Sequence, residues 1–381
     1  EDLEAIPDSP TGRMLAHPLP HTGTPQRRVK LNDPELKTLV FRGVHARNLK
    51  IDEITVPLQR FTVVTGVSGS GKSTFCREVL FANLSRRLKD AQAPLVGTDQ
   101  LTGFENVGRV LEVDQTPIGK NSRSCPATYV GIMTAIRDLY AATNEALARG
   151  YDASRFSFNK AVGACPVCAG QGLRTVEMNF LPDVKVLCEA CAGKRFNPET
   201  LEVLWRGKSI GDVLEMEIDE AVDFFASMPS IAYPLKLMQD VGLGYLTLGQ
   251  PSPTLSGGEA QRLKLVTELA KVRTDGSFAA RAPHTLYVLD EPTVGLHMTD
   301  VDRLSKVLSR LVDAGSTVVV IEHNLDIAAD ADWIIDLGPE GGAKGGKVVA
   351  QGSPKMVARK NTATGIVLKA FLAEHKPVKS A

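Results

Sequence analysis

The sequence predicts an α/β fold in which a parallel sheet is interrupted by a long, mostly helical insert. Three short apolar runs rich in β-branched residues, Phe61–Thr65, Thr285–Leu289 and Thr317–Ile321, are typical of buried strands. Apolar residues recur at helical spacing between the last two runs, and a strand–helix–strand unit implies parallel strands. This rhythm stops over about residues 119 to 283. We therefore expect an insert there.

The flanking elements can be placed in order. Five prolines between residues 7 and 25 predict that residues 1–34 form a linker. A strand is expected at Leu39–Phe41, and a helix at Thr74–Leu88. Residues 35–118 and 284–372 would then form one discontinuous core around a subdomain of residues 119–283.

The helix between the last two strands has its own start and stop signals. Thr299 or Asp300 is the expected N-cap, and Gly315 is expected to end the helix. Its apolar face would consist of Leu304, Val307, Leu308, Leu311 and Val312.

The composition is that of a globular protein with two or three domains. Its 381 residues are 43% hydrophobic and 23% charged. Lys and Arg together number 44, as do Asp and Glu, so contact with DNA would need a local basic face. No apolar run approaches the ~20 residues of a membrane span. The chain opens on acidic residues without an initiator Met or a signal sequence, so we expect a fragment or processed chain that acts in the cytoplasm, with no membrane partner.

A glycine-rich loop between a predicted strand and a predicted helix indicates phosphate binding. Its sequence is Gly66-Val67-Ser68-Gly69-Ser70-Gly71-Lys72-Ser73. The glycines let backbone amides close around phosphate oxygens, Lys72 would bridge the β- and γ-phosphates, and Ser73 would ligate Mg²⁺. The alternative is a chance Gly/Ser loop. The candidate residues for binding ATP are Gly66, Ser68, Gly69, Gly71, Lys72, Ser73 and Thr74.

Acidic residues after a later strand supply the candidate hydrolytic groups. Asp290 ends the strand and would hold Mg²⁺, and Glu291 could act as general base toward the attacking water. His323 follows the next strand and could contact the γ-phosphate. The alternatives are a solvated acidic pair and a structural histidine.

The stretch Leu255–Arg262, with Ser256-Gly257-Gly258-Glu259 inside it, resembles the signature motif of the ABC ATPases. Ser256 can cap a helix, and an ordinary capped helix is the alternative interpretation. The resemblance implies that Ser256, Gly257 and Gly258 grip the γ-phosphate bound to an opposite ATPase unit. Since the chain has one phosphate loop and one signature, hydrolysis would need a second ABC unit.

Two Cys-x-x-Cys pairs predict a zinc module at about residues 160–200. Cys165 and Cys168 are separated from Cys188 and Cys191 by 19 residues, which suits tetrahedral Zn²⁺. Unliganded thiols or a redox pair are the alternatives. Cys76 and Cys125 have no such pairing and are expected to be small buried residues.

Taken together, the chain resembles the C-terminal half of UvrA, from about Pro7 to about Gly352. UvrA proteins are the damage-recognition ATPases of bacterial nucleotide excision repair. Cys125 and Val294 depart from the family, where Asn and a second Thr are usual. The stretches that carry the resemblance are Asp114–Lys120, Pro126–Tyr129, Arg155–Asn159, the cysteine pairs, Phe180–Val184, Gly193–Asn197, Ile321–Asp326 and Asp332–Gly342.

The resemblance implies further roles. Gln115 would sense Mg²⁺ and the γ-phosphate, and the four cysteines would hold the zinc of a module that reaches toward DNA. Candidate DNA phosphate contacts are Lys120, Arg123, Lys194 and Arg195, although a solvated surface is the alternative for each. The first ATPase unit and the region that binds UvrB would precede residue 1.

The expected function is ATP-dependent recognition of damaged duplex DNA, with ATP, Mg²⁺ and Zn²⁺ as cofactors. A UvrB-like partner would bind through the missing half. Two alternatives stay open: a transporter-type ABC ATPase subunit, and a UvrA paralogue that gives resistance to DNA-binding drugs.

Overall fold

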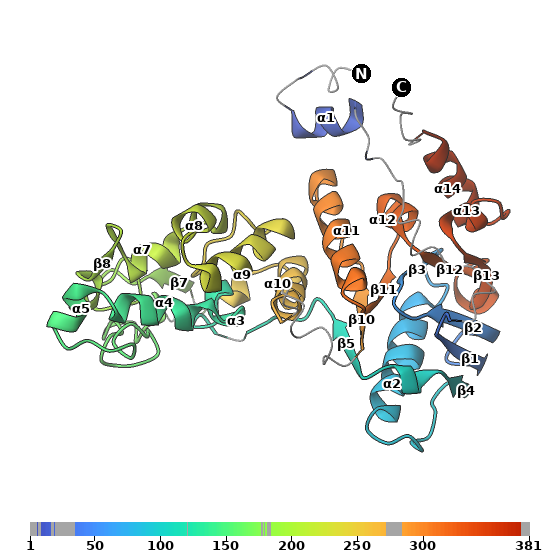
Figure 1. The fold of residues 1–381 in the computed structure, drawn as a ribbon, viewed down its shortest axis with the longest axis horizontal. Helices are drawn as coiled ribbons and strands as arrows, with labels where there is room; N and C mark the ends of the chain where they lie inside the picture. Colours follow the sequence, from blue (N-terminus) through green and yellow to red (C-terminus); the bar gives the residue numbers. More distant parts are fainter. Residues whose placement is uncertain are drawn as a thin grey trace. The chain divides into compact units, whose positions relative to one another are not determined.

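The computed structural model of the chain describes residues 6, 9–16, 19, 35–119, 121–176, 178, 180, 184–271 and 284–374. These residues form two compact units (Figure 1). The first contains the described residues up to Asp114 and those from His284 onward, and the second is Gln115–Lys271.

The first unit is built on a six-stranded sheet with the order β13-β12-β3-β11-β10-β5. All neighbouring strands are parallel except β13, which is antiparallel to β12. The three predicted strands are confirmed, and two of them extend one residue further. The strands are β3 (Phe61–Gly66), β5 (Arg109–Val113), β10 (Thr285–Asp290), β11 (Thr317–Ile321), β12 (Trp333–Gly338) and β13 (Lys347–Gly352).

A second, antiparallel sheet completes the core of this unit. It consists of β1 (Thr38–Val44), β2 (Ile51–Pro57) and β4 (Thr98–Thr102), in the order β2-β1-β4. Side chains alternate along a strand, so every second residue of β10 and β11 faces this core. Leu286 and Val319 accordingly share one buried cluster with Phe41 of β1 and Phe75.

The helix expected after the glycine loop is present, but it has two geometries. Its first part, η2 (Thr74–Phe81), has the wider π-helical turn, and α2 (Ala82–Arg87) continues it. The other helices of this unit are α1 (Pro10–Ala16), η3 (Phe104–Asn106), α11 (Met298–Asp313), α12 (Leu325–Asp330), η5 (Gly342–Lys344), α13 (Pro354–Val357) and α14 (Ala363–Glu374).

One helix terminus and one part of the predicted linker differ from the prediction. The N-cap of α11 is His297, whose Nδ1 accepts the Thr299 N–H at 3.3 Å, so the expected caps Thr299 and Asp300 are wrong. Within the predicted linker, α1 forms because the Ser9 hydroxyl accepts the Gly12 N–H at 3.0 Å. Most of residues 1–34 lie outside the described residues.

The second unit is mostly helical. Its helices are α3 (Pro126–Tyr129), α4 (Ile132–Ala141), α5 (Asn144–Ala148), α6 (Pro198–Leu201), α7 (Ile210–Glu215), α8 (Ile218–Phe224), α9 (Pro229–Asp240), η4 (Ser252–Thr254) and α10 (Gly257–Leu269). Two hairpins accompany them, β6 (Leu173–Val176) with β7 (Val184–Leu187) and β8 (Leu204–Trp205) with β9 (Lys208–Ser209). In the part of the chain that the structure describes, no helix could cross a membrane.

Candidate functional site

The glycine loop lies where the sequence places it, between β3 and η2. Gly66 has a φ of +131°, and a Cβ there would lie 1.9 Å from the Leu337 carbonyl oxygen. Gly71 has a φ of +101°, and its Cβ would lie 2.4 Å from Leu49. Both positions therefore require glycine. The Phe75 N–H donates to the Gly71 carbonyl at 2.8 Å, so the helix begins directly after the loop. The end of the loop thus lies at a helix N-terminus, where anions bind favourably.

A second glycine-rich segment, residues 341–346, braces this loop. The Gly342 N–H donates to the Gly69 carbonyl at 3.0 Å, and the Gly346 N–H donates to the Ser70 carbonyl at 3.2 Å. The Asn48 side chain also donates to the Gly69 carbonyl, at 3.1 Å. The sequence analysis did not identify this brace, although the run of glycines after β12 was a visible signal.

Lys72 is buried against its own loop. Its Nζ donates to the carbonyls of Gly66 and Val67, both at 3.0 Å. Burial lowers the pKa of Lys72, while the nearby carboxylates of Glu291 and Asp290 act in the opposite direction. The predicted lysine and the two predicted acidic residues therefore act on one another electrostatically.

Asp290 is held by an arginine that sequence reasoning missed. Arg77, from η2, places Nη2 3.1 Å from Asp290 Oδ2 and Nε 2.7 Å from Glu112 Oε1. Arg77 therefore joins the helix after the glycine loop to the ends of β5 and β10. No short motif marks this residue, because the pairing depends on how the helix packs on the sheet.

Glu291 and His323 lie near one another on the exposed side of the strand ends. Glu291 has a φ of +43°, which is unusual for a residue other than glycine, and its Oε1 lies 3.7 Å from His323 Nε2. Beneath them, the buried Glu322 carboxylate accepts the Thr293 N–H at 2.9 Å, the His323 N–H at 2.8 Å and the Asn324 N–H at 3.0 Å. Glu322 ties together the two loops that carry the candidate hydrolytic groups.

In the second unit, the signature-like segment forms the predicted helix cap. The Ser256 hydroxyl accepts the Glu259 N–H at 3.3 Å, and the Glu259 carboxylate accepts the Ser256 N–H at 2.7 Å. Gln115 packs on this cap, because a Cβ on Gly257 would lie 3.2 Å from Gln115 Cβ. Lys264 of α10 donates to the Thr116 carbonyl at 2.8 Å. The segment that contains Gln115 and Thr116 is therefore bound to the signature-like helix α10.

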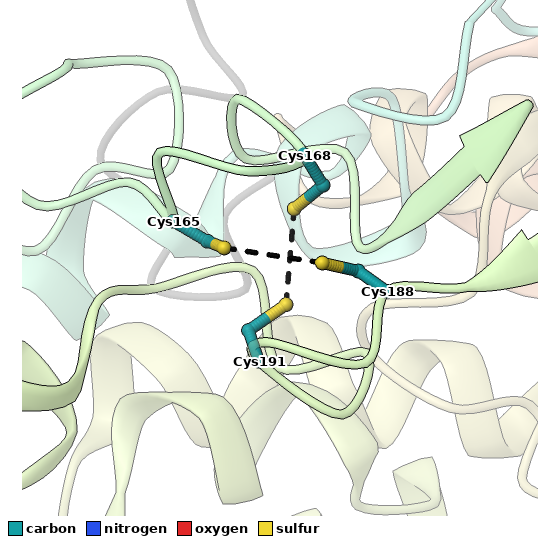
Figure 2. Close-up of side chains that lie close together, drawn as sticks. All are labelled: Cys165, Cys168, Cys188 and Cys191. Carbon is teal, nitrogen blue, oxygen red and sulfur yellow. Dashed lines mark hydrogen bonds between the residues drawn. The ribbon is translucent and has the colours of Figure 1, made fainter.

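The four paired cysteines converge on one point (Figure 2). All four sulfurs lie within 4.8 Å of one another and all four residues are buried. The Cys165–Cys188 sulfur distance is 4.0 Å and the Cys168–Cys191 distance is 3.7 Å. Tetrahedral zinc with Zn–S bonds of about 2.3 Å separates sulfurs by about 3.8 Å, so this donor set fits zinc.

The Ala-Gly pair that follows each Cys-x-x-Cys pair forms a tight turn. Ala169-Gly170 and Ala192-Gly193 all have positive φ, which turns the chain sharply after each cysteine pair. Cys76 and Cys125 are buried outside the cluster, as expected. Cys125 is the N-cap of α3, a position that an Asn side chain would cap more strongly.

One candidate DNA contact is wrong. Arg195 is only 4% exposed, and its guanidinium donates inward to the carbonyls of Ser122 and Gly249. Lys194 forms an ion pair with Asp212 at 2.6 Å, and Arg123 donates to the Ala169 carbonyl at 2.8 Å. Lys120 lies outside the described residues, as do residues 181–183 of the stretch Phe180–Val184.

Comparison with known proteins gives strong similarities. UvrABC system protein A of Thermus thermophilus is 54% identical over 373 residues, which cover 98% of this chain and 38% of that protein. The Bacillus subtilis protein of the same name is 49% identical over 381 residues, which cover 99% of this chain and 38% of that protein. The chain therefore spans well under half the length of these relatives. No family model matches it.

A solved structure agrees with these sequence relatives. The crystal structure of UvrA2 from Deinococcus radiodurans superposes with a TM-score of 0.83 at 45% identity. The match covers 97% of this chain and 43% of that one.

Proposed function

This chain is a relative of UvrA along nearly its whole length, and from that premise we propose that it is the C-terminal half of a UvrA-like ABC ATPase that recognises damaged DNA. The observation that carries the proposal is the closed set of four cysteine sulfurs, which lies in the sequence between the glycine loop and the signature-like helix. An ATPase with only the glycine loop and the signature would fit many functions. The similarity to UvrA proteins supports the repair function in particular.

The ATPase role falls on residues that the first unit brings together. When bound, ATP would supply the γ-phosphate bond that is hydrolysed. Mg²⁺ would offset the negative charge of the phosphates. Lys72 binds the phosphates once its Nζ leaves the loop carbonyls, and Ser73 and Asp290 hold the cation. Glu291 takes the proton of the attacking water, with His323 beside the γ-phosphate.

Residues of the second unit serve the composite site. Gln115 responds to the cation and the γ-phosphate. Ser256, Gly257 and Gly258 bind the γ-phosphate held by an opposite ATPase unit, either another copy or the N-terminal half. Because Gln115 packs on Gly257, a change at the glutamine reaches the signature directly.

The cysteine site holds one structural zinc, and its module contacts duplex DNA. Net charge is balanced over the chain, so binding depends on local contacts to the DNA backbone. Damage is then detected through the shape and deformability of the duplex rather than its sequence. A UvrB-like partner binds through the other half of the protein.

The test measures binding of lesion-containing and undamaged duplexes by fluorescence anisotropy, with and without ATP. Zinc-loaded protein is compared with Cys188→Ser, and Cys125→Ser serves as a buried-cysteine control outside the cluster. We expect nucleotide-dependent binding that weakens with salt and is changed only by Cys188→Ser. Absence of DNA binding in every condition would contradict the proposal for this chain.

A UvrA paralogue that protects against DNA-binding drugs is the second candidate, since the similar proteins include both UvrABC system protein A and a protein named UvrA2. Genetic complementation separates the two. Rescue of ultraviolet survival in a repair-deficient strain by the full-length protein would eliminate the paralogue.

A further inference from the structure

A buried arginine links the second cysteine knuckle to two loops of the second unit. Arg195 follows Cys191 by four residues, and its carbonyl accepts the Cys165 N–H at 2.9 Å, so its backbone joins the two knuckles. Its side chain leaves the knuckle and is only 4% exposed, with the guanidinium 5.2 Å from the centre of the Phe158 ring.

The two loops that receive this side chain lie next to candidate site residues of the second unit. One guanidinium nitrogen donates to the Ser122 carbonyl at 2.7 Å, in the segment that follows Gln115. The other donates to the Gly249 carbonyl at 2.6 Å, shortly before the signature-like residues. Ser124 and Ser252 then join the same two segments, through a backbone bond and a hydroxyl bond of 2.8 Å each. The guanidinium of one arginine therefore bonds both loops to the cysteine module.

The charge of Arg195 has no carboxylate partner among the described residues, because both of its side-chain acceptors are neutral carbonyls. A buried cation without a counter-charge is costly. The link to the metal site is geometric. The Arg195 backbone lies beside the second knuckle, and its carbonyl accepts the Cys165 N–H of the first. Zinc that joins the two knuckles would therefore fix the point from which the guanidinium reaches the Ser122 and Gly249 carbonyls.

We propose that Arg195 is the positioning residue through which metal occupancy of the cysteine site sets the order of the signature-like loop. The inference rests on the zinc site of the proposed function. It assigns Arg195 a role inside the protein in place of a contact to DNA.

The experiment is hydrogen exchange measured by mass spectrometry on the whole chain, after metal analysis of each protein. Arg195→Met keeps the stem and removes the charge, and Arg195→Lys keeps the charge without the fork. Residue 195 has a φ of +72°, which strains any residue other than glycine. Met and Lys both carry a Cβ, as Arg does, so neither replacement changes this strain. The matched control is Lys194→Met, which loses the Asp212 ion pair on the same knuckle.

We expect Arg195→Met to retain one zinc while the Ser252 and Leu255 amides exchange on the order of tenfold faster, since a buried charged hydrogen bond is lost. Arg195→Lys restores part of the protection, and Lys194→Met exchanges like the parent. Removal of zinc from the parent should also speed hydrogen exchange at the Ser252 and Leu255 amides. In Arg195→Met, removal of zinc should cause little further increase in their exchange rates.

Unchanged exchange at these amides in zinc-loaded Arg195→Met would overturn the inference. So would an equal response to zinc removal in parent and variant, or loss of zinc from the variant, which would make Arg195 only a part of the knuckle. A parent chain that binds no zinc would instead refute the metal site itself, and the metal analysis alone reveals it.

Discussion

Glu291 has the position and the freedom that a general base needs. It follows the end of β10, its side chain is about half exposed, and His323 lies 3.7 Å away. We predict that Glu291→Gln retains ATP binding and lowers hydrolysis at least about 100-fold, because the amide cannot accept the proton from water. Phosphate release and binding of a fluorescent ATP analogue measure the two properties. Turnover close to that of the parent would exclude Glu291 from this role.

Arg77 forms an ion pair with Asp290, the proposed ligand of Mg²⁺. The guanidinium contacts Asp290 at 3.1 Å, and in the proposed site it would compete with Mg²⁺ for the same carboxylate. We predict that Arg77→Met shifts Mg²⁺-dependent nucleotide binding to several-fold lower Mg²⁺ concentration, measured by titrating Mg²⁺ at fixed analogue. Arg47→Met is the control, since Arg47 pairs with Glu78 on the surface. An unchanged or higher Mg²⁺ midpoint would contradict the competition.

Individual residues were predictable from sequence where a motif fixes the backbone around them. The glycine positions, Lys72, Asp290 and the four cysteines belong to such motifs. The structure places the four sulfurs together, and Asp290 acts electrostatically on Lys72. Arg77 and Arg195 were not predictable in the same way. Their partners come from distant segments, and a sequence pattern does not show that a charged side chain such as Arg195 points inward.

Among the elements, the start of β10 is held by a histidine that should make stability depend on pH. His284 Nδ1 donates to the Asn106 carbonyl at 2.7 Å, and Nε2 lies 2.8 Å from the Thr317 hydroxyl. Burial lowers the pKa of His284 below its ordinary value of 6.5. The neutral ring is therefore favoured in the folded state, and the unfolded chain binds more protons below that value.

We predict that this contribution to stability is complete above pH 6.5 and is lost as the pH falls from there toward the folded pKa of His284. Urea-unfolding midpoints between pH 5 and 8 measure the effect. His284→Gln should flatten the dependence, whereas replacing the exposed His45 with Gln should not. A parent protein with no loss of stability over this range would refute the assignment.

Elements were predictable where local signals agree with tertiary packing. The buried strands and the Ser256 cap satisfy that condition. The cap of α11 was missed because an imidazole nitrogen accepts the amide in place of the usual hydroxyl or carboxylate. The π-helical turn after the glycine loop was missed because apolar periodicity does not distinguish it from an α-helix.

At the scale of the whole molecule, the chain has one glycine loop and one signature-like segment. We predict that ATP turnover per chain rises with protein concentration, because each composite site needs a second unit. A concentration series of phosphate release, with the fraction of dimer followed by light scattering, measures this dependence. Brisk turnover independent of concentration would contradict the composite site.

Mixing two inactive variants supplies the matched control. Lys72→Met leaves the signature intact, and Gly258→Asp leaves the glycine loop intact. Together they form one complete site in a mixed dimer, so activity should return on mixing although neither variant is active alone. Variants that stay inactive when mixed, while still forming dimers, would argue against sites shared between units.

The brace on the glycine loop has a consequence for the order in which the protein is made. Residues 66–73 are synthesised early, yet Gly342 and Gly346 hold the loop, and β3 pairs with β11 and β12. Those contacts come from segments that leave the ribosome more than 240 residues later, after the entire second unit. In a nascent chain the glycine loop therefore has contacts such as that from Asn48 early, but it lacks the bonds to Gly342 and Gly346 until those later residues have been made.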